Sequence, residues 1–164
     1  MNVKKWVTVV MLMVFLTGCG AEETFEMVSD SYVTPVSAEI KEIGVTLPLE
    51  AAAPAVESDS GRIYLCKDYE ITVQTMEAGN LDATVRSISG YGADELTIME
   101  TAADGIKRYE FVWASAGETG DQVGRAVILD DGSHHYILSV LAEAAGAEKH
   151  TGTWQEMFRS FSVN

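Results

Sequence analysis

The sequence predicts an α+β domain in which a mainly antiparallel β-sheet is covered by helices. Segments that alternate apolar and polar residues follow one another through the middle of the chain, with short turn signals between them. Two shorter segments, 81–89 and 154–160, change to the 3.6-residue period of an amphipathic helix. Strands in hairpin succession are typical of an antiparallel sheet, against which each helix buries its apolar stripe.

The first strands are expected between residues 44 and 76. Residues 44–49 alternate and predict an edge strand, the position in a sheet that tolerates a proline. An ordered loop over 50–55 follows. Alternation returns in 62–66 and 69–76, which predicts a hairpin with Lys67-Asp68 at its tip.

The first helix is marked by a change of period after Gly79. Asn80 is suited to cap its N-terminus, and Gly90 or Gly92 is suited to end it. The apolar residues recur at helical spacing in Leu81, Val85 and Ile88.

Four further strands are predicted over 95–100, 107–113, 123–129 and 135–141. Asp104-Gly105 between the first two is a strong signal for a tight hairpin turn. The second of these strands carries an aromatic ladder on one face, formed by Tyr109, Phe111 and Trp113. Such a ladder could bind a carbohydrate, but its period of two beside an apolar helix favours the protein core.

The closing helix has both a predicted start and a predicted buried face. Thr153 and Glu156 fit a capping box at its N-terminus. Its apolar stripe, the widest in the chain, consists of Trp154, Met157, Phe158 and Phe161.

The order of these elements resembles the Mog1/PsbP-like fold. The resemblance rests on the Leu47-Pro48 opening, the helix after the first strand group, the strand that bears Tyr136, and the ending Arg159-Ser160-Phe161. It covers residues 43–164 and implies an α/β/α sandwich. The members of that fold that are understood act mainly as binding or assembly factors.

The N-terminus predicts export and a lipid anchor. Two lysines precede an apolar run over 6–16, which as a helix would reach about 16 Å, too short for a hydrocarbon core of about 30 Å. The following Leu16-Thr17-Gly18-Cys19 resembles the lipobox of bacterial lipoproteins. That resemblance implies a lipidated Cys19 as the mature N-terminus, on the extracytoplasmic face of a cell membrane. The alternative is an ordinary signal peptide cut near Gly20.

Three regions follow from these observations. Residues 1–18 are expected to be the signal peptide, and 19–42 the lipidated cysteine with an acidic flexible tether interrupted by Pro35. Residues 43–164 are expected to form a single globular domain.

The charge excludes one class of function. The net charge is −14, and it becomes −16 when Lys4 and Lys5 leave with the signal peptide. Such a chain repels phosphate backbones, so nucleic acid is not an expected partner. No phosphate loop or nucleophile elbow occurs, and no cofactor is expected.

Two groups of residues are candidates for chemistry. Cys66 has no basic neighbour that would lower its pKa, which favours a structural thiol over a nucleophile. The second group combines residue types that bind metal ions. It is only a weak candidate, because adjacent histidines on a strand point to opposite faces and cannot easily bind one ion together. Its members are Asp130, Asp131, His134 and His135.

The expected function is therefore that of a lipid-anchored, non-catalytic binding or assembly module. Its partner, a protein or a small molecule, is unknown. The alternative is a cell-surface hydrolase or a metal-dependent enzyme that uses Cys66 or the pair His134/His135.

Overall fold

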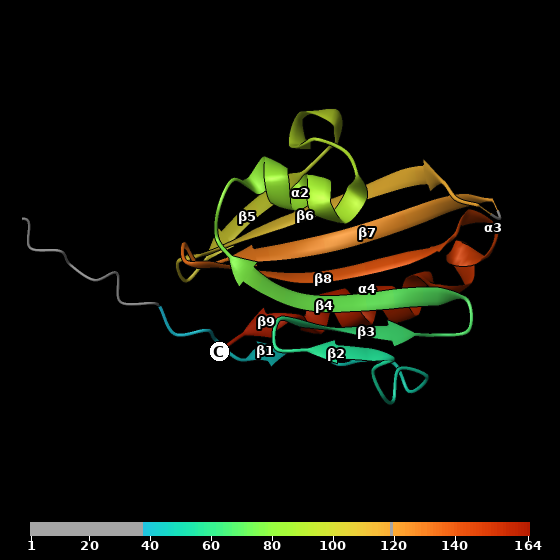
Figure 1. The fold of residues 1–164 in the computed structure, drawn as a ribbon, viewed down its shortest axis with the longest axis horizontal. Coiled ribbons are helices and arrows are strands. Elements are labelled where there is room, and N and C mark those ends of the chain that lie inside the picture. The colour runs from blue at the N-terminus through green and yellow to red at the C-terminus, as the bar shows by residue number, and fades with distance from the viewer. Residues whose placement is uncertain (1–37, 119) are drawn as a thin grey trace, which may run out of the picture. The chain divides into compact units, whose positions relative to one another are not determined.

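The computed structural model describes residues 38–118 and 120–164. Seven strands form one antiparallel sheet in the order β2-β3-β4-β8-β7-β6-β5, and β1 pairs with β9 in a separate two-stranded ribbon (Figure 1). The strands are β1 (Ile43–Gly44), β2 (Val56–Ser58), β3 (Gly61–Leu65), β4 (Tyr69–Glu77), β5 (Met99–Ala103), β6 (Ile106–Ala116), β7 (Asp121–Asp130), β8 (His134–Glu143) and β9 (Ser162–Val163). The helices are α2 (Leu81–Ser89), α3 (Ala144–Ala147) and α4 (Thr151–Ser160), with 3-10 turns η1 (Ala93–Glu95) and η2 (Glu148–His150).

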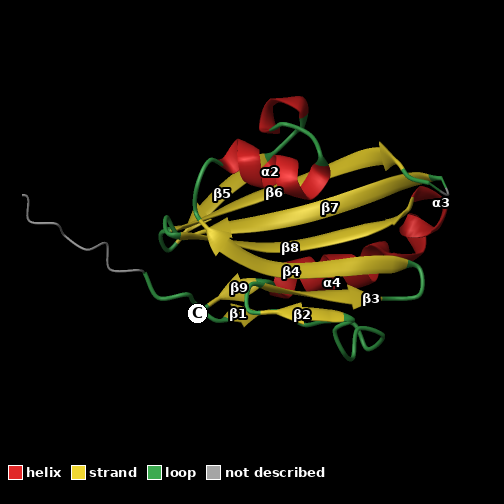
Figure 2. Ribbon diagram, viewed as in Figure 1, coloured by secondary structure: helices red, strands yellow, loops and turns green. Residues whose placement is uncertain are grey.

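Helices cover both faces of the large sheet, so the domain has three layers. In Figures 1 and 2, α2 lies in front of the sheet and α4 lies behind it. The alternation along β6, β7 and β8 divides their side chains between two separate apolar cores. The predicted α+β class, with a mainly antiparallel sheet covered by helices, is confirmed.

The core under α4 is built on the predicted stripe of the closing helix. Trp154, Met157, Phe158 and Phe161 are each at most 8% exposed. They pack against inward-facing residues of β4, β7 and β8, among them Ile71, Val127, Leu138 and Val140.

The core under α2 holds the aromatic ladder. Tyr109, Phe111 and Trp113 are buried together with Val85 of α2, which confirms packing rather than a sugar platform as the ladder's role. Asn80 caps α2 as predicted, because its side-chain oxygen accepts a hydrogen bond of 2.9 Å from the backbone NH of Asp82. Gly90 ends the helix in the left-handed conformation with φ of 82°.

The prediction of an edge strand over 44–49 is wrong beyond Gly44. The NH of Thr46 donates to the Ser160 hydroxyl at 2.8 Å, and the carbonyl of Pro48 accepts from Ala51 in a turn. Val45 and Leu47 nevertheless pack against the α4 core. Their alternation therefore reflects burial on one side, without a strand partner.

The strand predicted over 95–100 starts later than expected. The Glu95 carboxylate accepts the backbone NH of Gly92 at 2.6 Å and closes the turn η1. The strand β5 begins only at Met99. The predicted hairpin turn is present after it, where Asp104 and Gly105 have φ of 53° and 80°.

The predicted capping box of the closing helix is also wrong. The helix begins at Thr151, directly after α3 and η2, and no side chain caps its first residue. Helical turns therefore precede Thr153 in the chain. Thr153 and Glu156 lie inside the helix as exposed residues.

The start of the described chain is bonded to the domain. The NH of Lys41 donates to the Tyr136 hydroxyl at 2.9 Å, and Glu42 and Asn164 exchange two backbone hydrogen bonds. Residues 1–37, with the predicted signal peptide, Cys19 and most of the tether, lie outside the described residues. Among the residues that are described, no helix has the length and apolarity to cross a membrane.

Candidate functional site

The two histidines of the metal candidate point to opposite faces of β8, as their adjacency predicts. His135 lies on the α2 side, where its Nδ1 is 2.8 Å from the Thr84 hydroxyl. His134 lies on the other side, and its ring centroid is 6.0 Å from that of Tyr136. Both side chains are buried.

The two aspartates of this group stabilise the turn between β7 and β8. Asp130 accepts the NH of Gly132 at 2.7 Å, and Asp131 accepts the NH groups of Ser133 and His134 at 3.0 and 2.8 Å. Within the described residues, no three His, Cys, Asp or Glu side chains are grouped so that they could hold a metal ion. The four candidates are therefore not brought together into one site.

His135 is a poor base despite its neighbour Asp130. Burial lowers the pKa of the His135 imidazole, and the carboxylates of Asp130 and Asp131 only partly offset this effect. The imidazole is buried, and one of its nitrogens is already bonded to Thr84. The ring of His135 is therefore shielded from solvent in the described domain.

Cys66 is a free, half-buried thiol just after β3. Burial raises the pKa of the Cys66 thiol, and the Glu50 carboxylate adds to that rise, while the hydroxyl of Tyr69 opposes it. The same hydroxyl donates a short hydrogen bond to Glu50. A thiol with a raised pKa stays protonated at neutral pH and is a weak nucleophile.

A recess of about 450 Å³ lies between α4 and strands β6 and β7. Three arginines converge there in a domain that is otherwise strongly acidic. The residues that line this recess, called the arginine recess below, are Arg108, Glu110, Arg125, Gln155, Phe158 and Arg159.

Arg108 and Glu110 form the fixed part of the arginine recess. The Nε of Arg108 donates to Glu110 at 2.7 Å, and its terminal nitrogens donate to the carbonyls of Phe158 and Phe161 at 2.8 and 3.4 Å. These carbonyls lie at the C-terminal end of α4, where a positive charge also interacts favourably with the helix dipole. Arg108 therefore attaches the end of α4 to the sheet, and three of its five N–H donors are engaged in these hydrogen bonds.

Arg125 is held in place, and most of its N–H donors have no hydrogen-bond partner among the described residues. One terminal nitrogen donates to Glu110 at 3.2 Å, and the guanidinium carbon lies 4.7 Å from the centroid of the Phe158 ring. Burial alone would raise the pKa of the Glu110 carboxyl, but Arg108 and Arg125 together lower it. Glu110 therefore stays ionised and orients the guanidinium of Arg125.

Arg159 is the unpaired cation of the recess. It is exposed on α4, one turn after Gln155, and no described residue forms an ion pair or hydrogen bond with its side chain. Residues four apart share one face of a helix, so Gln155 and Arg159 lie over the recess together.

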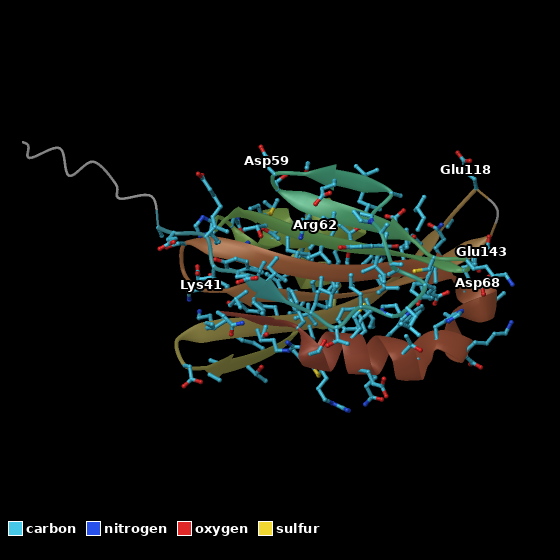
Figure 3. All side chains as sticks on the ribbon, turned by 90° about the horizontal axis from the view of Figure 1, so that it is seen from below. Lys41, Asp59, Arg62, Asp68, Glu118 and Glu143 are labelled. Carbon is cyan, nitrogen blue, oxygen red and sulfur yellow. The ribbon has the colours of Figure 1, made fainter. Side chains whose placement is uncertain are left out.

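A second recess of about 550 Å³ lies at one end of the sheet, where β8 leads into α3. Asp68 and Glu143, which both line it, lie at this end in Figure 3. Lys67 and Lys149 stand among the carboxylates of Asp68, Glu70 and Glu143. Its mixed charges select neither an anion nor a cation.

The arginine recess was not predicted from the sequence, although the alternation along one of its strands was visible there. Alternation along β6 places Arg108 and Glu110 on the face opposite the aromatic ladder. The missing information was the pairing of β6 with β7, in which Arg125 stands opposite Val112. The position of α4 over the sheet was also needed, because it brings Arg159 to the same place.

Comparison with known proteins finds a similarity of fold architecture to a solved structure. No protein family model matches the chain, and no curated protein matches it in sequence. The crystal structure of the Saccharomyces cerevisiae Ran-binding protein Mog1p is similar, with 14% sequence identity and a TM-score of 0.48. The match covers 74% of this chain and 89% of that chain. At this level the likeness concerns the arrangement of elements alone.

Proposed function

We propose that this protein is a non-catalytic binding module attached by lipid on Cys19 to the extracytoplasmic face of a cell membrane. The observation that carries the binding part is the arginine recess. It is an open recess with oriented guanidinium groups, some of whose donors have no partner in the described domain.

The lining of this recess suits binding better than catalysis. It contains no serine, cysteine, histidine, lysine or tyrosine that could act as a nucleophile or exchange a proton. Its one carboxylate, Glu110, is paired with two arginines that lower its pKa, which makes it a weak base. The groups that remain available are hydrogen-bond donors with fixed positive charge, and such groups hold an anion in place.

The enzyme alternative has less support in the geometry. Its candidate nucleophile Cys66 has a raised pKa, and His134 and His135 lie on opposite faces of the sheet. A triad or a metal site needs its members on one side of the sheet, within hydrogen-bond or ligand distance.

The attachment rests on the sequence. A charged start, a short apolar run and Leu16-Thr17-Gly18-Cys19 are typical of an exported lipoprotein. Two acyl chains are enough for stable anchoring, and a chain of strong negative charge is repelled by anionic lipid head groups. The lipid would therefore be the main attachment to the bilayer.

The test is metabolic labelling of the full chain in a bacterial host with an alkyne-tagged fatty acid. We expect label on the wild type and none on Cys19→Ser. Cys66→Ser is the matched control and should label like the wild type. Proteinase added to intact spheroplasts should degrade the labelled protein. Unchanged labelling of Cys19→Ser, or protection from the proteinase, would contradict the proposed attachment.

A further inference from the structure

We infer that the arginine recess and the apolar surface beside it bind a small organic carboxylate, with the carboxylate on Arg125 and Arg159 and the apolar part over Met99 and Val112. This inference deepens the proposed function, since it rests on the domain acting as a binding module and names the site and the ligand class.

The apolar surface is continuous with the arginine recess. A smaller recess of about 250 Å³ is lined by Met99 and Val112, and it shares Glu110 and Arg125 with the arginine recess. Met99 pairs directly with Glu110, and Val112 pairs directly with Arg125. Residues paired directly across strands point to the same face of a sheet, so the four side chains lie together on the side that carries α4.

Helix α4 leaves this part of the face open. Met99 and Val112 are each 63% exposed, whereas Val127 and Leu129 on the same face are buried under the helix. The open area therefore joins cationic donors to exposed apolar side chains, which is the combination that an amphiphilic anion matches.

The charges favour a single carboxylate over a phosphate or a polyanion. Three guanidinium groups face one carboxylate inside the recess, so the local charge is positive. The rest of the chain is acidic, with a net charge of −14, and this field opposes a ligand with many negative charges. Glu110 in the recess also repels a dianion more than a monoanion.

The available donors match the planar geometry of a carboxylate. A guanidinium has five N–H donors, and one hydrogen bond of Arg125, to Glu110, is present in the described domain. Contact with the Phe158 ring restricts the orientation of the guanidinium. Arg108, Glu110 and Arg125 are 21–31% exposed, so a ligand can reach them in partly desolvated surroundings.

The experiment is isothermal titration calorimetry of the full lipidated chain in a nonionic detergent, with benzoate as the probe. Benzamide, which has the shape of benzoate but no charge, is the control for the carboxylate. Its titration also corrects the measured heat for partition of the aromatic ring into the micelles. Inorganic phosphate tests the other source of anionic oxygens, and acetate tests the apolar contribution. We expect saturable binding of benzoate, weaker binding of acetate, and no saturable binding of benzamide or phosphate.

Variants assign the binding to the recess. Arg159→Gln should weaken benzoate binding about tenfold, since one charged hydrogen-bonding partner is lost, and Arg159→Lys should restore part of it. Lys149→Gln removes the same charge from an exposed residue outside the recess and should bind benzoate like the wild type. Val112→Thr should reduce the preference for benzoate over acetate.

Four results would overturn the inference. They are no saturable binding of benzoate by the wild type, binding of benzamide as tight as that of benzoate, tighter binding of phosphate than of benzoate, and unchanged benzoate affinity in Arg159→Gln. None of them would affect the labelling of Cys19, so failure of this inference can be distinguished from failure of the proposed membrane attachment.

Discussion

Gly124 gives the sharpest stability prediction, because the indole ring of Trp113 occupies the space of its missing side chain. The two residues pair directly across β6 and β7. A Cβ atom added to Gly124 would lie 2.1 Å from Cζ2, 2.2 Å from Cε2 and 2.6 Å from Cη2 of the indole. Restoring ordinary contact at 3.4 Å requires the ring to move by about 1.3 Å.

Such a movement is costly because Trp113 is itself part of the α2 core. Its ring centroid lies 5.8 Å from that of Phe111, and its side chain is 8% exposed. A close-packed interior does not absorb a shift of this size without loss of contacts elsewhere. Overpacking typically costs 1–3 kcal/mol, and we expect Gly124→Ala to lie at the upper end, at about 3 kcal/mol.

The assay is urea denaturation of the full chain followed by far-ultraviolet circular dichroism. Gly146→Ala is the matched control, because its new methyl group meets nothing within 4 Å. It should be neutral or slightly stabilising. In a Trp113→Leu background the cost of Gly124→Ala should fall below about 1 kcal/mol, as a double-mutant cycle requires of a direct clash. A cost below about 1 kcal/mol with Trp113 present would refute the reasoning.

Three further predictions concern α4 and the turn before β8. Phe158→Ala should lower the free energy of unfolding by about 3–5 kcal/mol, enough to unfold much of the protein, since the residue is 1% exposed in the α4 core. If the Phe158→Ala variant were as stable as the wild type, α4 would be peripheral to the fold. Thr153→Ala should change the free energy of unfolding by less than about 0.5 kcal/mol in the same urea assay, because Thr153 is exposed inside the helix and caps nothing. A loss of about 1 kcal/mol would show instead that Thr153 caps the helix. Burial would raise the pKa of the Asp131 carboxyl, but hydrogen bonds from His134, Ser133 and Tyr136 and the charge of Lys41 lower it overall. Its contribution to stability is therefore present above the unfolded pKa of about 3.9 and is lost as the pH falls through the lower folded value. Asp131→Asn should be less stable than the wild type at neutral pH, and the difference should shrink in acid; a difference independent of pH would contradict the assignment.

The alternation of the long strands was sufficient to predict the sheet and its two buried faces. Tyr109, Phe111 and Trp113 appear as one face in the sequence because the period is two, and they are buried together. The stripe from Trp154 to Phe161 likewise predicted the helix that covers the other face. These features depend on periodicity over several residues, which a single sequence records directly.

The errors in the predicted elements arose where a local signal competes with tertiary contacts. Thr153 and Glu156 have the spacing of a capping box, but the preceding turns α3 and η2 are already helical and move the start of α4 upstream. Residues 44–49 alternate, yet beyond Gly44 their backbone bonds go to a side chain of α4 and to a turn. Neither competitor is visible in the local pattern.

The arginine recess could not be predicted because it depends on long-range pairing. Arg125 reaches Glu110 through the pairing of β6 with β7, and Arg159 arrives on a helix more than thirty residues further along the chain. The weak metal candidates at 130–135 were prominent in the sequence because they are adjacent. The fold instead assigns the aspartates to a turn and the histidines to opposite faces.

The most direct test of binding at the arginine recess is a nitrogen–proton correlation spectrum of the arginine side chains during a benzoate titration of the full chain. We predict that the Nε–Hε signals of Arg125 and Arg159 shift together and saturate at one dissociation constant. Arg62, which pairs with Glu57 at 2.7 Å on the opposite edge of the sheet from β5, should not move. Saturating shifts at Arg62, or no shift at Arg125 and Arg159, would contradict the account.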